Sequence, residues 1–431
     1  MQKAEKNRLN RVRNLIVLCA ISAVILSVST YAWFIGMQRV GVNPFEISIE
    51  VTDSLLLSLD GDTFHEKVTI NSENLDEVSY ENHTNSWGLA DSEGNFIGLK
   101  PVSTVGEMDS DVSRMILFEK SSMTASPGGF RLLSSRINNF QDEDDDKGFT
   151  GAAKGYVVFD LFIKNFTGDE YYTTNDVKNE EAIYLTKDSE VTVGSTGIEN
   201  TGIENAIRVA FAQIGRVKAD TTASTVTGIT CNVVGESEEP QYTEETGITG
   251  ICRKAQIWEP NDTKHNENAI KWYQTSCLSR IGETVMDSQS FEDDSCGEVK
   301  EGEFYDTYAI AAEITPNDEV DVYDGPHYNG YEGSGEFLQA YPYFTDTMKN
   351  KSGTERPEFM SLAPNSITKV RVYIYLEGQD IDNYEFSMIG KQVSVKFGFE
   401  KQRYEPSDIE YEGPKLPYDE EGEGGDEGED D

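Results

Sequence analysis

Apolar residues recur at every second position in several segments of this chain, which is the spacing of a half-buried β-strand. In residues 368–376, Val370, Val372 and Ile374 alternate with polar or amphipathic positions that include Lys369 and Arg371. Residues 392–400 repeat the same alternation. Both segments therefore predict half-buried strands of an antiparallel sheet.

Two other apolar segments differ from this simple alternation. Residues 156–164 are apolar on both faces, which predicts a central strand that is covered on each side. Residues 203–214 fit a helical spacing as well as a strand spacing, and we favour a strand. The segments together predict an all-β fold, because turn signals separate them and hardly any amphipathic helix is found.

The fold class expected from this pattern is a jelly-roll-like antiparallel β-sandwich with long insertions. The chain of 431 residues exceeds one ordinary domain of about 50 to 200 residues. We assign the sandwich to residues 35–402 and place the insertions at about 61–150 and 215–360, which are polar and rich in turn residues. Residues 403–431 are acidic and poor in apolar side chains, which predicts a disordered tail.

The N-terminus combines a basic start with an uncharged apolar run at residues 15–28. This order is typical of a signal peptide, and small residues favour cleavage near Ala32. If the apolar segment is extended to Phe34, it is long enough to act as a membrane anchor. Residues 1–34 are therefore a signal peptide or an N-terminal anchor, and both predict an extracellular or cell-surface protein.

A strand pattern follows the export segment directly. Its alternating positions are Phe45, Ile47, Ile49 and Val51. We expect residues 41–52 to form a strand that joins subunits in an assembled state, because an added strand can complete the open edge of a sheet.

The chain is strongly acidic, with 36 basic and 78 acidic side chains and a formal net charge of −42. A polyanionic surface repels phosphate backbones, so the composition excludes nucleic acid as a partner. It favours cations or basic partners, although keeping an exported protein soluble is the commoner role of such a charge.

Four cysteines lie beyond the apolar segment that contains Cys19, namely Cys231, Cys252, Cys277 and Cys296. An even number in an exported domain predicts two disulfides, for which three pairings are possible. Pairing of sequence neighbours would close short loops. A zinc site is the weaker interpretation, since no close cysteine pair is present and His265 is the only histidine between them.

No catalytic constellation is found in the sequence, so we expect no enzyme activity. His65 and Glu66 begin a zinc-protease pattern, but the second histidine four positions on is missing. The whole chain has only four histidines, which leaves little material for a metal triad or a general base.

Calcium is the one possible cofactor, because carboxylate-rich loops suit a hard cation. One candidate comprises Asp142, Asp144 and Asp146, although the positions that follow depart from an EF-hand loop. The second comprises Glu377, Asp380, Asp382 and Asn383, in the predicted turn after the strand at 368–376. A solvated turn is the competing interpretation of this second cluster.

The chain resembles a known family in its N-terminal part and in three strand segments. The sequence TYAWF at 30–34, followed by LLLSLDG at 55–61, resembles exported Gram-positive proteins that carry a SipW-dependent type of signal peptide, a group that includes TasA and the camelysin-like proteins. GYVVFDL at 155–161, ENAIRVAF at 204–211 and VRVYIYLEGQD at 370–380 are similar to clostridial members. The insertions and the acidic tail carry no such resemblance.

The resemblance implies export, a jelly-roll-like sandwich and, in the TasA branch, matrix fibres assembled by donation of an N-terminal strand. Camelysin-like proteins are described as metalloproteases, but their zinc-ligand pattern is missing from this chain. We therefore expect an exported structural or adhesive protein of the surface or biofilm matrix, whose partners are copies of itself or other surface proteins. The alternative is a monomeric ectodomain that is held in the membrane by residues 1–34 and binds a ligand or cation. A surface hydrolase is a distant third.

Overall fold

The structure is a computed structural model. It describes residues 47–51, 54–78, 80, 83–89, 98–104, 106–110, 113–120, 134–136, 155–168, 170–193, 202–233, 240–271, 302, 308–310, 338–340, 344–378, 380–383 and 393–401. The predicted export segment, the acidic tail and the position of Phe45 lie outside these residues.

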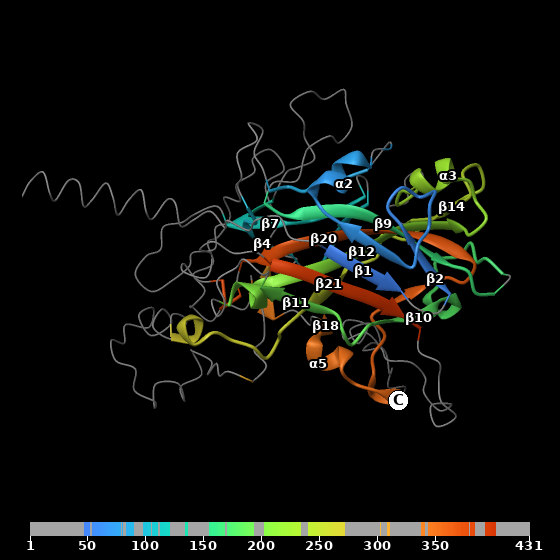
Figure 1. Ribbon diagram of the computed structural model, residues 1–431. Coiled ribbons are helices and arrows are strands. Elements are labelled where there is room, and N and C mark those ends of the chain that lie inside the picture. The colour runs from blue at the N-terminus through green and yellow to red at the C-terminus, as the bar shows by residue number, and fades with distance from the viewer. Residues whose placement is uncertain are drawn as a thin grey trace, which may run out of the picture.

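The described elements are mainly strands, and most of these strands belong to two sheets (Figure 1). The smaller sheet has the order β19-β10-β21-β1-β3, and β11 also pairs with β21. Its strands are β19 (Met360–Leu362), β10 (Glu181–Leu185), β21 (Val393–Glu400), β1 (Ile47–Val51), β3 (Lys67–Ile70) and β11 (Glu190–Val193).

The larger sheet has the order β13-β14-β12-β20-β4-β7-β8, and β9 joins it through β20. At its sides, β2 pairs with β9, and β15 pairs with β12 and β18. Its strands are β13 (Tyr242–Thr243), β14 (Ile248–Gly250), β12 (Ile207–Lys218), β20 (Ser366–Glu377), β4 (Pro101–Ser103), β7 (Phe118–Lys120), β8 (Ser134–Arg136), β9 (Val157–Asn165), β2 (Leu55–Ser58), β15 (Gln256–Glu259) and β18 (Phe344–Thr345).

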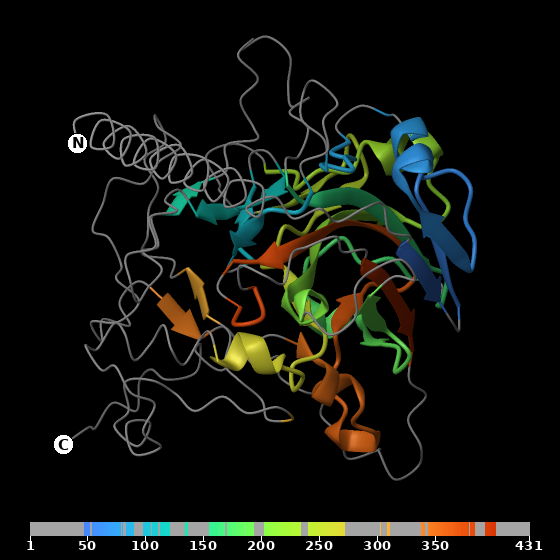
Figure 2. The same cartoon turned by 60° about the vertical axis from the view of Figure 1, so that its left-hand side comes forward.

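The remaining described elements are short. Two small hairpins pair β5 (Met108–Asp109) with β6 (Arg114–Met115), and β16 (Tyr308–Ile310) with β17 (Leu338–Ala340). The α-helices α2 (Ser72–Glu77), α3 (Ala223–Thr227) and α5 (Asp346–Lys349) lie at the periphery of the strands (Figure 2). Single 3₁₀ turns are η1 (Val177–Asn179), η2 (Ile203–Ala206) and η3 (Gly353–Glu355).

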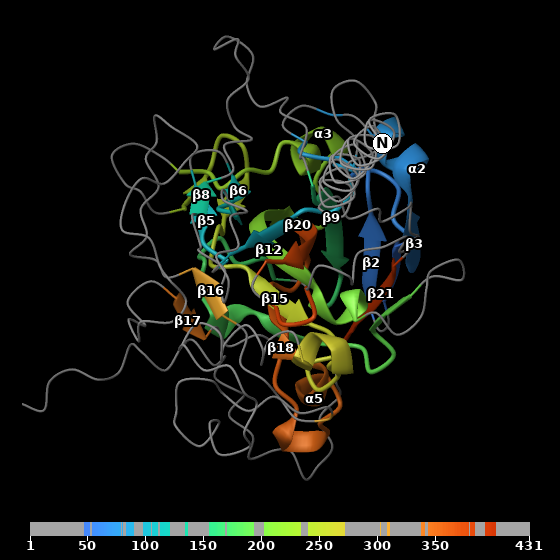
Figure 3. The ribbon, with the colours of Figure 1, turned by 90° about the vertical axis from the view of Figure 1, so that its left-hand side faces the viewer.

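The two sheets enclose a common apolar core, and an end-on view shows β21 and β3 to one side of β20 and β12 (Figure 3). Phe211 of β12 lies at the centre of this core, with its ring 5.0 Å from that of Phe359 and 5.1 Å from that of Phe397 in edge-to-face geometry. Alternate residues of β1, β21, β9 and β20 complete the core. The predicted all-β sandwich is confirmed.

The larger sheet is covered on its other face as well, by a second apolar cluster that includes Val158, Phe162 and Tyr373. The prediction of a central strand at 156–164 is confirmed by β9. For residues 368–376 the predicted strand is confirmed by β20. The prediction that one face of this strand is exposed is wrong, because all twelve residues of β20 are buried. Lys369 and Arg371 are buried because they pair with Asp160 of β9 beneath this second cover.

Strand pairing is mixed. β1 pairs with β21, β15 with β18 and β20 with β4 in parallel, whereas the long β12–β20 and β9–β20 pairs are antiparallel. The long strands of the larger sheet thus pair antiparallel as expected, the three parallel pairs are an addition that the sequence pattern did not indicate, and the jelly-roll connectivity stays a prediction. The half-buried strand at 392–400 is confirmed by β21. The preference for a strand at 203–214 is confirmed by β12 from residue 207 onward, whereas residues 203–206 form the 3₁₀ turn η2.

Candidate functional site

The predicted assembly strand forms β1 within its own chain, where it lies between β21 and β3 (Figure 1). Ile49 pairs with Phe397 in the parallel direction and with Val68 in the antiparallel direction. Ile47 and Ile49 have no exposed surface, and Val51 is 8% exposed. The first described strand thus completes a sheet whose central strand, β21, is the last described strand.

The chain changes sheets immediately after β1. Only residues 52–54 separate β1 from β2, and β2 pairs with β9 in the larger sheet. Ser54 in this connection has φ +69°, in the left-handed region that non-glycine residues seldom occupy. A short connection therefore carries the chain from β1 in the smaller sheet to β2 in the larger one.

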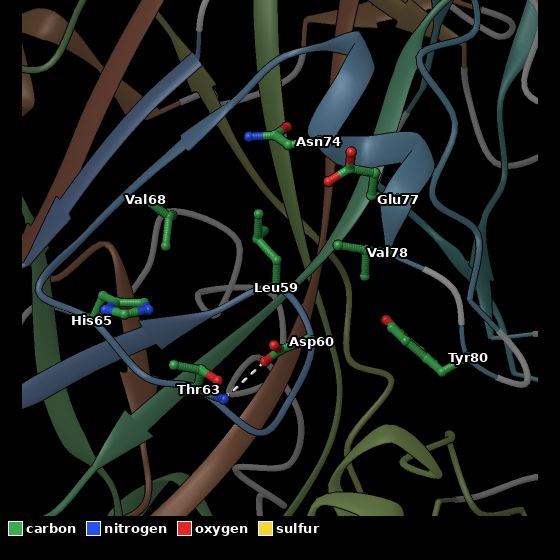
Figure 4. A pocket seen from close by; sticks show the side chains of 9 residues that line it. All are labelled: Leu59, Asp60, Thr63, His65, Val68, Asn74, Glu77, Val78 and Tyr80. Carbon is green, nitrogen blue, oxygen red and sulfur yellow. Dashed lines mark hydrogen bonds between the residues drawn. The ribbon is translucent and has the colours of Figure 1, made fainter.

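A pocket of about 480 Å³ lies between the β2–β3 connection, α2 and Tyr80 (Figure 4). Its apolar lining includes Leu59 and Val68, and its polar lining includes Asp60, His65 and Glu77. Pockets that combine an apolar wall with a few convergent polar groups are common ligand sites. In the sequence analysis His65 belonged only to an incomplete zinc-protease pattern, and the pocket as a whole was not predicted.

The turn that forms one wall of the pocket is built by the LLLSLDG sequence. Asp60 accepts hydrogen bonds from the backbone N–H groups of Asp62 and Thr63, each at 2.9 Å, and from the Ser58 hydroxyl at 2.8 Å. Burial opposes ionisation of Asp60, but these hydrogen bonds outweigh it and lower its pKa. Gly61 permits the turn with φ +73°. The side chains of this sequence thus fix a local turn.

Tyr80 connects the pocket to a buried group of charges. Its hydroxyl donates to Asp160 Oδ2 at 2.7 Å, while Arg371 Nε donates to Asp160 Oδ1 at 2.7 Å. Lys369 Nζ lies 3.1 Å from Asp160 Oδ2. The side chains of Lys369, Asp160 and Arg371 are at most 2% exposed. We call Asp160, Lys369, Arg371 and Tyr80 the buried tetrad.

Burial and mutual charge shift the titration of the tetrad. Burial lowers the pKa of Lys369 to about 8, although the Asp160 charge acts in the opposite direction. Burial disfavours ionised Asp160, yet the charges of Arg371 and Lys369 hold its pKa well below the usual value. Burial also raises the pKa of Tyr80. Groups with strongly shifted pKa values beside a pocket are candidates for chemistry. The sequence signal that could have indicated the buried tetrad is Asp160, an aspartate within the apolar run VVFDLFI.

The predicted calcium turn after β20 contains partners that the sequence pattern did not indicate. Asp380 accepts from Arg208 Nη2 at 2.5 Å through Oδ2 and from the Asp382 backbone N–H through Oδ1. Asp382 lies 3.0 Å from His265 Nδ1 through Oδ2 and accepts from the Asn266 backbone through Oδ1. All four carboxylate oxygens therefore have protein partners.

The other two predicted calcium ligands of this turn also contact protein groups. The Ser103 hydroxyl donates to Glu377 Oε1, and Asn383 Nδ2 donates to the Glu377 carbonyl at 3.1 Å. Across the described ranges, no group of three or more His, Cys, Asp or Glu side chains is arranged to hold a metal ion. Residues 142–146 lie outside those ranges. Calcium binding at either place stays a prediction.

One of the expected disulfides joins Cys231 to Cys252, with the Cα atoms 5.3 Å apart and a sequence separation of 21. Its loop includes Gly250, where an added Cβ would lie 1.8 Å from the Cys231 carbonyl oxygen, so the close approach requires glycine. Cys277 and Cys296 lie outside the described residues, and their pairing stays a prediction.

No known family model matches this chain, and no curated protein or solved structure shows significant similarity to it. In the part of the chain that the structure describes, no helix is long and apolar enough to span a bilayer. The function is therefore argued from the geometry of β1 and its surroundings.

Proposed function

We propose that this chain is an exported structural protein that assembles into a surface fibre by exchange of β1 between subunits. The observation that carries the proposal is the position of β1. It is the first described strand, it occupies a slot between β21 and β3, and only residues 52–54 separate it from β2 in the other sheet. A strand from another copy could fill the same slot with the same register.

The energetics favour a slot that is always filled. Burying each of Ile47, Ile49 and Val51 contributes about 1.5–3 kcal/mol, so a subunit that lacks β1 exposes a large apolar groove. A seated β1 does not leave readily for the same reason. Exchange is therefore expected while newly exported chains fold, before β1 settles in its own slot.

The burial of β1 also limits which mutations can test the proposal. Replacement of Ile47 and Ile49 by aspartate would place two charges in the core of the monomer itself. Such a variant would unfold in either mode of pairing. A covalent trap on the outer face of the sheet distinguishes the modes without disturbing the core.

The trap uses the registered pair Ser48 and Lys396, whose side chains lie on the outer face. Neighbouring strands are about 4.8 Å apart, which lies within the Cα separation that disulfides span. The double variant Ser48→Cys with Lys396→Cys is oxidised after assembly and analysed on a denaturing, non-reducing gel. A ladder of covalent oligomers is expected if β1 is exchanged.

The matched control is Glu50→Cys with Lys396→Cys, which lies on the same face but two residues out of register, since Glu50 pairs with Gly398. It should give no ladder. If the registered pair instead closes quantitatively within single chains at every protein concentration, strand exchange is refuted. That result favours the alternative of a monomeric ectodomain, which the pairing of β1 within its own chain also fits.

A further inference from the structure

The ammonium group of Lys369 is the least satisfied charge in the buried tetrad. Lys369 has no exposed side-chain surface, and among the described residues its Nζ has no well-aligned hydrogen bond. Its surroundings are the carboxylate of Asp160 at 3.1 Å and the rings of Tyr80 and Phe162, whose centroids lie 5.2 and 5.8 Å away. A buried ammonium with so few partners requires an explanation.

We propose that Lys369 and Asp160 are joined by an intramolecular isopeptide bond between Nζ and Cγ. The two side chains come from adjacent antiparallel strands, where Arg371 is directly opposite Asp160 and Lys369 is the diagonal neighbour on the same face. The bond would link β9 and β20, two adjacent strands of the larger sheet that are covered on both faces.

The tetrad holds each group that such a condensation needs. A proton passes from Nζ to Oδ2, and the freed lone pair of Nζ attacks Cγ to form the C–N bond. The electron pair of the carbonyl moves to Oδ1, where Arg371 Nε donates at 2.7 Å and stabilises the developing charge.

Departure of water then completes the reaction. The Tyr80 hydroxyl, 2.7 Å from Oδ2, gives its proton to that oxygen and takes one from Nζ. The C–O bond breaks, the electron pair of Oδ1 restores the carbonyl, and Oδ2 leaves with two protons. An ammonium and a carboxylate thus become an amide and one water molecule, with no oxidant or other reactant. Tyr80 also lines the pocket of Figure 4, which gives the water a route to solvent.

The charge balance favours the product. Lys369, Asp160 and Arg371 carry a net charge of +1 as ions, and after condensation Arg371 alone carries the same +1, while the amide oxygen still accepts from its Nε. Two buried charges disappear without changing the net charge of the cluster. Arg371 keeps Asp160 ionised and therefore slows the initial proton transfer, but the reaction is needed only once in the life of each molecule.

The test is mass spectrometry of the intact, disulfide-reduced chain, followed by a peptide map. The expected result is a mass one water molecule below that of the uncondensed chain, and a branched peptide that joins Lys369 to Asp160. Lys369→Met, which keeps the length and apolar stem of the side chain, should lack the deficit. Tyr80→Phe should condense more slowly when followed after refolding, because the hydroxyl that relays the proton is missing.

The ion pair between Lys396 Nζ and Asp188 Oδ2 is an internal control, with a distance of 2.6 Å and side-chain exposures of 35% and 62%. Water competes at this open site, so its two peptides should stay separate in the same digest. If the parent chain has the full uncondensed mass, and Lys369 and Asp160 appear only in unlinked peptides, the proposal is overturned. The parent map decides the question even if a variant fails to fold.

Discussion

Glu180 is the residue whose replacement should most clearly expose the contribution of buried charge to this fold. Its carboxylate, 1% exposed, accepts hydrogen bonds from Arg216 of β12, from Arg253 at 2.9 Å and from the Ser361 hydroxyl of β19 at 2.6 Å. Glu180 immediately precedes β10, so this one side chain links strands of both sheets. Glu180→Gln preserves its shape and removes its charge.

The expected cost of Glu180→Gln near neutral pH is about 3 kcal/mol of unfolding free energy, the lower end of the range for breaking a buried ion pair. The lower end applies because Arg216 also donates to the Thr174 carbonyl at 2.6 Å and Arg253 is 21% exposed. Gln can still accept one of the hydrogen bonds, but Arg216 is left buried without a counter-charge.

The cost should depend on pH with a defined sign. Burial disfavours ionised Glu180, but the hydrogen bond and charge of Arg253 and the charge of Arg216 outweigh it and lower its pKa below 4.5. A lowered carboxyl pKa stabilises the folded state at high pH, and this stabilisation is lost as the pH falls through the folded-state value. The unfolding free energies of the parent and the variant should therefore converge as the pH falls from 4.5 through the lower folded-state pKa of Glu180.

Urea unfolding followed by tryptophan fluorescence at several pH values measures both effects. Glu267→Gln is the control, since Glu267 is 83% exposed and pairs with Lys271 four residues further along the chain; the stability of this variant should match that of the parent within error. A Glu180→Gln variant that is as stable as the parent at neutral pH, or equally destabilised at every pH, would refute the reasoning.

Three further outcomes are expected. Phe211→Ala should lower the unfolding free energy by about 3–5 kcal/mol in the same urea assay, because it opens a cavity among three core aromatic rings; a loss below about 1 kcal/mol would contradict this packing. Cys252→Ser should cost about 3 kcal/mol under oxidising conditions, and calorimetry should show no difference from the parent once both are reduced. For Asp382→Asn, the melting temperature should rise relative to that of the parent as the pH increases from about 4 to 7. Burial raises the Asp382 pKa to about 6, so ionisation of Asp382 in this range destabilises the folded parent. A difference in melting temperature that stays constant from about pH 4 to 7 would contradict the raised pKa.

The local pattern of apolar residues was sufficient to predict where the main strands lie in the sequence. The alternation at 392–400 predicted β21, and the apolar run at 156–164 predicted a strand covered on both faces, because side chains in a strand alternate between two sides whatever the partner is. Neighbour pairing of Cys231 with Cys252 was among the possibilities. The pocket beside Tyr80 was not predicted, since its lining comes from a turn, a strand and a short helix.

The amino-acid sequence by itself thus determined the all-β class and the position of its main strands, because period-two burial is a property of the strand alone. The tertiary structure decided which strands meet. Only its pairing places β1 against β21, more than three hundred residues away in sequence, and Lys369 against Asp160. The charged face of residues 368–376 suggested contact with water, yet it is buried, because Asp160 on the neighbouring strand supplies the opposite charge and a second apolar cluster excludes the solvent.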